Sequence, residues 1–140
     1  MSVFSDMIDG LVTRLGTVTG LHPYNHPPDV INEYPAAVVL LQRVNLIPAL
    51  GGDSVEVEMK VVYLQAANPS DEAFSGLYDA IDPAPAGTTS VVKQIRADRT
   101  LDGKADDSEV VAVENIGRRA IESGGFLAGA DFIVKAIKRI

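Results

Sequence analysis

The 140-residue sequence predicts a single α+β domain, residues 1–140, built on a mostly antiparallel four-stranded sheet flanked by helices, with a protruding β-hairpin arm. Three observations predict this fold. The length allows one hydrophobic core and is short for two. Apolar residues follow a helical spacing in three segments and a strand-like spacing in four. The order helix, strand, strand, helix, helix, strand, strand puts strands next to each other in pairs, which favours antiparallel hairpins.

The helices are predicted from apolar spacing, caps and breakers. Apolar residues recur three and four positions apart over residues 4–15. The proline-rich residues 20–28 cannot continue that helix, because proline removes a backbone donor and biases its predecessor toward extended geometry. A second helix is expected within residues 68–82 and a short third helix within residues 90–97. The expected N-caps are Ser2 or Ser5, Asn68, and Thr89 or Ser90.

Four segments are expected to be strands. Residues 36–44 are apolar on both faces, and residues 54–66 alternate between apolar and charged side chains. Residues 109–116 and 126–137 alternate well enough to supply the last two strands. The second segment is long for a strand, so we expect its first half to project from the domain as an arm.

An apolar insert between residues 44 and 54, which contains Leu46, Ile47, Pro48 and Leu50, joins the first two strands, where a turn would normally be polar. Burying a large aliphatic side chain stabilises a fold by about 1.5 to 3 kcal/mol, whereas leaving several in water favours aggregation. The insert therefore either folds back over its own sheet or is covered by a neighbouring subunit. The predicted interface residues of this arm are Leu46, Ile47, Leu50, Val55 and Val57.

Composition excludes several classes of function. Asp and Glu outnumber Lys and Arg by 19 to 12, and the resulting net charge of -7 argues against a broad phosphate-binding surface. The absence of cysteine excludes disulfides, thiolate metal sites and a Cys nucleophile. The longest apolar stretch, residues 36–41, is far shorter than the roughly 20 residues that span a bilayer. The N-terminus has no basic residue ahead of an apolar core, so we expect no secretory signal and a cytoplasmic chain.

Charge is unevenly distributed along the sequence. Residues 116–140 hold five basic and two acidic side chains, whereas the loop at residues 98–109 is dominated by acidic ones. Opposite patches of this kind can orient one subunit against another. The candidate electrostatic interface comprises Arg118, Arg119, Asp102, Asp106 and Asp107.

The acidic loop nearly matches a calcium-binding loop. Carboxylates fall at ligand positions one, five, nine and twelve, with a glycine at six; these residues are Asp98, Asp102, Asp106, Glu109 and Gly103. The segment that follows the loop has the β-branched density of a strand, so the second helix of an EF-hand is missing. A solvated acidic loop is the favoured interpretation, and calcium binding stays open.

Neither the two histidines nor the glutamates of the predicted strands form a clear site. His22 and His26 have the spacing of ligands on a helix, but Pro23 rules the helix out, which favours ordinary loop histidines. No pair of carboxylates stands out as buried and close together, as acid–base catalysis would require. Solvated strand positions are therefore expected for Glu56, Glu58, Glu109 and Glu114.

The chain resembles the tail terminator proteins of long-tailed bacteriophages over nearly its whole length. The resemblance depends mainly on "INEYPAAVV", on "GTTSVVKQI" leading to "TLDG", and on the closing "FLAGADF". Proteins of that family are α+β subunits that form a six-membered ring on the last ring of the tail tube. There they end tube polymerisation and present the docking surface for head-completion and connector proteins.

The resemblance implies a structural virion protein with no catalytic activity and no cofactor. It implies a homohexameric ring at the tail–neck junction, assembled in the host cytoplasm, which contacts the major tail tube protein. Viral DNA would pass through the lumen without specific binding, in keeping with the negative net charge. The alternatives are another neck component, such as a head-completion stopper or a tail-tube-like protein, and a small metal-dependent enzyme that uses the acidic loop.

Overall fold

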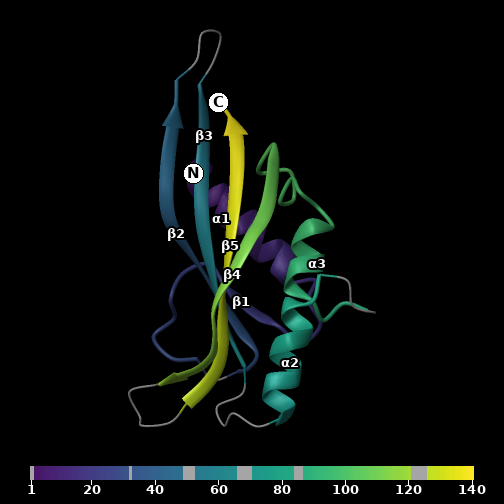
Figure 1. The fold of residues 1–140 in the computed structure, drawn as a ribbon. Coiled ribbons are helices and arrows are strands. Elements are labelled where there is room, and N and C mark those ends of the chain that lie inside the picture. The colour runs from purple at the N-terminus through teal and green to yellow at the C-terminus, as the bar shows by residue number, and fades with distance from the viewer. Residues whose placement is uncertain (1, 32, 49–52, 66–70, 84–86, 121–125) are drawn as a thin grey trace.

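A computed structural model describes residues 2–31, 33–48, 53–65, 71–83, 87–120 and 126–140. The described chain has an α+β fold, as the sequence predicts, with a five-stranded mixed sheet and three helices (Figure 1). None of these helices is long and apolar enough to span a membrane. The elements are α1 Val3–Leu15, β1 His22–Tyr24, β2 Ala36–Ile47, β3 Ser54–Leu64, α2 Asp71–Ile81, α3 Val91–Arg96, β4 Asp107–Ala120 and β5 Phe126–Arg139.

The sheet has the strand order β1-β2-β3-β5-β4. All neighbouring pairs are antiparallel except β1 and β2, which are parallel over His22–Tyr24 and Ala36–Val38. The sheet is mostly antiparallel, as predicted, but it has five strands where the sequence predicts four, and the added strand forms the parallel pair. The added strand lies in the proline-rich stretch that was expected to be non-helical. Pro23 is accommodated because β1 is an edge strand, where a missing backbone donor costs no ladder hydrogen bond.

The strands are longer than predicted at the arm. β2 continues to Ile47, so Leu46 and Ile47 are strand residues and not part of a turn. Leu46 lies opposite Val55, and Ile47 lies opposite Ser54, whose other neighbour is Arg139 of β5. β2 continues beyond its apolar run, residues 36–41, because it pairs with β3, which is in turn paired with β5.

One face of the sheet packs against the helices and forms the core. In Figure 1, α1 crosses the sheet from behind, α3 lies beside β4, and α2 lies below α3 and packs against β5. Successive residues of β3 alternate between buried and partly exposed, which confirms the predicted alternation. The buried residues of β3 on the helix side are Val55, Val57, Met59, Val61 and Tyr63. Met7, Leu11 and Leu15 of α1 complete the centre of the core.

The N-caps of α1 and α3 follow the sequence signals, whereas Asn68, the cap predicted for the second helix, lies outside the described residues. Ser2 is the N-cap of α1, since its Oγ accepts a hydrogen bond from the Ser5 amide at 3.0 Å. Ser90 caps α3 in the same way, accepting from the Lys93 amide at 3.0 Å. α1 also approaches the acidic loop closely at Gly10, where an added Cβ would clash with the carbonyl oxygen of Leu101. This contact fixes the acidic loop against the first helix.

Candidate functional site

The most exposed apolar surface on the sheet lies at the end of β2, β3 and β5 that extends beyond α2 and α3 in Figure 1. Leu46 is 73% exposed and Ile47 is 40% exposed. Together with Pro48 and Ile140 they line a groove of about 370 Å³. We call this surface the arm groove; its remaining lining residues are Asp53, Ser54 and Val55.

The predicted arm residues divide into two groups. Leu46 and Ile47 are exposed, whereas Val55 and Val57 are each only 1% exposed and belong to the core of this chain. Val57 therefore forms no part of the arm groove, and Val55 lines the groove but contributes almost no exposed area. The difference has a topological cause, because β3 is flanked by β2 and β5, whereas β2 has only the short β1 on its other side. Leu50 lies outside the described residues.

Both long outer strands have a backbone edge without a strand partner in the described residues. β1 covers only Ala36–Val38 of β2, so residues 39–47 pair with β3 alone. β4 pairs with β5 on one side only. An unpaired strand edge presents free backbone donors and acceptors and is a template for pairing with another chain.

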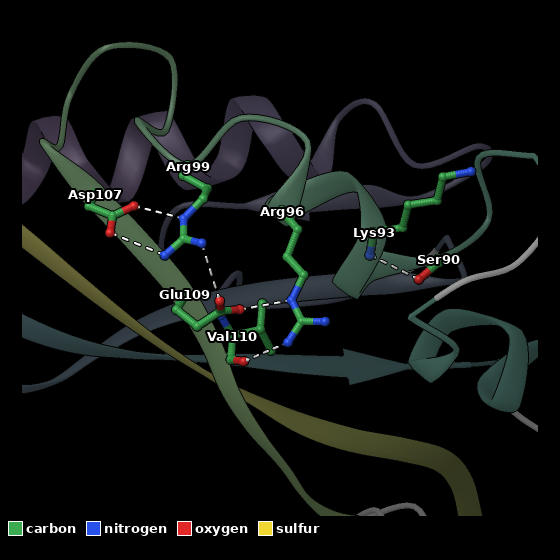
Figure 2. A network of polar contacts seen from close by, with 7 residues as sticks. All are labelled: Ser90, Lys93, Arg96, Arg99, Asp107, Glu109 and Val110. Atoms are coloured by element: carbon green, nitrogen blue, oxygen red, sulfur yellow. Dashed lines mark hydrogen bonds and ion pairs between the residues drawn. The ribbon is translucent and has the colours of Figure 1, made fainter.

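A network of ion pairs fastens α3 and the following loop to β4 (Figure 2). Arg99 donates to both carboxylate oxygens of Asp107, from Nε at 2.8 Å and from Nη2 at 3.1 Å. Arg96 donates from Nε to Glu109 at 2.8 Å and from Nη2 to the carbonyl oxygen of Val110 at 3.4 Å. The hydrogen bond with Asp107 raises the pKa of Arg99 and lowers that of Asp107. The bidentate contact between Arg99 and Asp107 positions β4 relative to the loop, although each exposed ion pair contributes little to folding stability.

The carboxylates of the acidic loop are bonded within the chain. Asp98 Oδ1 accepts from the Thr100 hydroxyl at 2.6 Å and from its amide at 3.0 Å, and Asp98 Oδ2 accepts from the Asp102 amide at 3.2 Å. These bonds, led by the one from the Thr100 hydroxyl, hold the pKa of Asp98 below its usual value. Asp98 thus stabilises a turn whose Leu101, Asp102 and Gly103 all have positive φ.

The calcium-like spacing does not produce a gathered set of ligands. The loop is followed by β4, as the sequence predicts, and not by a helix. Within the described ranges, no three side chains among His, Cys, Asp and Glu come together as a metal-binding group. The geometry assigns the loop carboxylates to turn formation and ion pairing.

The predicted electrostatic interface is partly engaged inside the monomer. Asp106 accepts from the backbone amide of Arg139 at 2.7 Å, which is the main reason that its pKa is lowered, and Lys138 lies 3.5 Å away. Asp107 is bonded to Arg99, and Asp102 is exposed. Arg118 and Arg119 lie in β4 opposite Ala128 and Leu127, but their side chains are outside the described part of the chain. Their role between subunits stays a prediction.

The remaining candidates do not converge on one site. His22 Nδ1 lies 3.0 Å from Glu33, whereas His26 Nδ1 lies 2.6 Å from Asn25 Oδ1. The four strand glutamates also have separate surroundings. Glu56 accepts a hydrogen bond from Asn45 at 3.3 Å, and Glu109 forms an ion pair with Arg96. Glu58 lies opposite Arg43 and Lys135, and Glu114 lies opposite Asp131.

The arm groove also contains residues that sequence reasoning missed. Ile140 is 71% exposed and is held beside the arm because its amide donates to the carbonyl oxygen of Asp53 at 2.8 Å. The alternation of side chains in β5 continues up to the C-terminus, and this pattern could have indicated that the strand extends beside the arm and brings Ile140 to the groove. Pro48 and Asp53 lie within the predicted insert but are not among the predicted interface residues. In comparisons with known proteins, no family model and no curated protein matches this chain.

Proposed function

We propose that the chain is a structural ring subunit of the tail terminator kind, which sits at the head-proximal end of a phage tail tube. In that position it ends polymerisation of the tube and provides the docking surface for the head or connector. The observation that carries the proposal is the arm groove, a cluster of exposed aliphatic side chains at the end of a sheet whose own helices leave it uncovered.

The exposure of the arm groove favours cover by another subunit. Leu46 and Ile47 are strand residues on an otherwise well-packed sheet, and the described chain leaves them in solvent. Full burial of such a side chain is worth about 1.5 to 3 kcal/mol, so covering both would contribute a few kcal/mol at each contact between subunits. In a ring this gain is repeated at each interface.

A cyclic ring needs two different, complementary patches on each subunit, because neighbouring subunits contact each other head to tail. The arm groove supplies one apolar patch at one end of the sheet. The edge of β4 and the adjoining helices carry a second apolar groove, lined in part by Ile81, Pro83 and Val111. Two unlike patches on opposite sides of one sheet favour ring geometry over a two-fold dimer.

The remaining partners follow from the same proposal. The ring contacts the major tail tube protein on one side and a head-completion or connector protein on the other, and it acts without catalysis or a cofactor. Viral DNA passes through its lumen without specific binding, since a subunit of net charge -7 disfavours phosphate contacts. The protein is then part of the virion at the tail–neck junction.

Electron microscopy of the purified chain, alone and mixed with tail tubes from a phage that encodes it, tests this function. Six-membered rings that cap tube ends support a terminator. Rings that stack into open-ended tubes would identify a tube-like subunit, and rings that bind only the head connector would identify a stopper. A chain that stays monomeric at high concentration and binds neither structure would overturn the proposal.

A further inference from the structure

We propose that the edge of β2 in one subunit pairs with the edge of β4 in the next, so that the sheets of the ring join into one continuous sheet. This inference rests on the proposed ring function and names the two surfaces that build the ring. The segments involved are residues 39–47 of β2 and residues 111–114 of β4.

The two edges are available in the described chain. Residues 39–47 of β2 lie beyond the reach of β1, which ends opposite Val38. On β4, the bond from Arg96 occupies the carbonyl oxygen of Val110. Val111 is the extra residue at a register shift, and residues 112–114 pair on the β5 side alone in the described chain. Proteins usually protect long edges with prolines, charges or a covering segment. A second strand supplied by a neighbour satisfies both edges at once.

Strand direction permits this pairing without turning a subunit over. β2 is antiparallel to β3, β3 is antiparallel to β5, and β5 is antiparallel to β4. It follows that β2 and β4 of one subunit run in opposite directions. When a copy is rotated about an axis along the strands, its β4 meets β2 of the first copy in an antiparallel arrangement, as a head-to-tail ring requires.

Apolar side chains match on the helix side of the two edges. Leu41 lies opposite the buried Met59, and so faces the helix side, yet it is 39% exposed because β2 is an outer strand. Beside the β4 edge lies a groove of about 220 Å³ whose apolar lining includes Ile81, Pro83 and Val92. Edge pairing brings Leu41 of one copy toward this groove in the next and covers both surfaces.

The irregularities of both edges agree with a curved, closed sheet. The β2 register shifts between Leu41 and Arg43, and the β4 register shifts between Val110 and Ala112. Such bulges bend strands and increase the local twist, and they are common where sheets close on themselves.

Crosslinking between two single-cysteine chains tests the contact directly, since the native sequence has no cysteine. One chain carries Leu41→Cys and the other carries Val111→Cys, two exposed positions on the two edges. A short bismaleimide is added to assembled rings formed from an equimolar mixture. A crosslinked dimer in the mixture, and none in either chain alone, is the expected result. A matched control replaces Leu41→Cys with Val30→Cys, which is exposed but lies outside the proposed edge.

The outcomes separate this inference from the proposed function. Rings without a crosslink between positions 41 and 111 would overturn the edge pairing and leave the ring function standing. Crosslinks within the Leu41→Cys chain alone would indicate a two-fold contact and overturn it as well. A chain that forms no rings would overturn both proposals.

Discussion

Leu46 and Val55 provide a matched pair for testing how the arm is covered. They lie directly opposite each other on the same face of β2 and β3, yet Leu46 is largely exposed and Val55 is buried. Leu46→Ala should lower the unfolding free energy of the monomer by roughly a quarter of the full burial energy of a leucine, or about 0.5 kcal/mol. For Val55→Ala, the lost transfer energy and the cavity together cost about 2 kcal/mol.

The two variants should therefore separate folding from assembly. Urea denaturation at a concentration too low for assembly measures the monomer, and native mass spectrometry measures the population of rings. Leu46→Ala should weaken each contact in the ring by about 1 kcal/mol, or about fivefold, while the monomer stays nearly as stable as wild type. Equal losses of monomer stability in the two variants would refute this reasoning, because Leu46 would then be covered by its own chain.

Three further predictions concern the folded subunit. Gly10→Ala should destabilise it by about 1 to 3 kcal/mol in thermal melts, because the methyl group meets the Leu101 carbonyl, whereas Gly16→Ala at the end of the same helix should be nearly neutral. Burial, with a smaller contribution from the charge of Asp79, raises the pKa of Tyr63 to about 12. The neutral phenol should therefore contribute about 3 kcal/mol of stability below pH 10, and this contribution should be lost as the pH rises toward 12. Tyr63→Phe should remove this pH dependence. The hydrogen bonds from Thr100 lower the pKa of Asp98, so its carboxylate should contribute to folding stability above the ordinary Asp pKa of about 4. This contribution should be lost as the pH falls below that value, and Asp98→Asn should make stability less dependent on pH in the acid range.

Local signals were sufficient to predict the helices and the alternating strand. Ser2 and Ser90 are recognisable as caps because a hydroxyl that precedes an apolar repeat accepts from an amide three residues later. The alternation of β3 is equally local, since each side chain faces away from its sequence neighbours. Such signals need no knowledge of what lies elsewhere in the chain.

Non-local features were mispredicted for physical reasons. β1 is only three residues long and contains a proline, so its strand character comes from pairing with β2 and not from its own propensity. The extension of β2 to Ile47 likewise depends on β3, which continues beside it and is itself paired with β5. The sequence also contains no marker that distinguishes Val55 from Leu46, because both are aliphatic residues of adjacent strands. Only the strand order shows that one is interior and the other lies at an edge.

The same alternation that builds the core can therefore supply the assembly surface. On β3 the apolar residues of the helix side meet the helices and are buried. On β2 the equivalent side holds Leu41 and Leu46, which the described helices do not cover. A chain selected only as a monomer would gain by placing charged residues at those two positions, because charge protects an edge from pairing. Aliphatic residues there are explained if the core of the subunit continues across the subunit boundary, so that each neighbour completes the packing that the isolated chain begins.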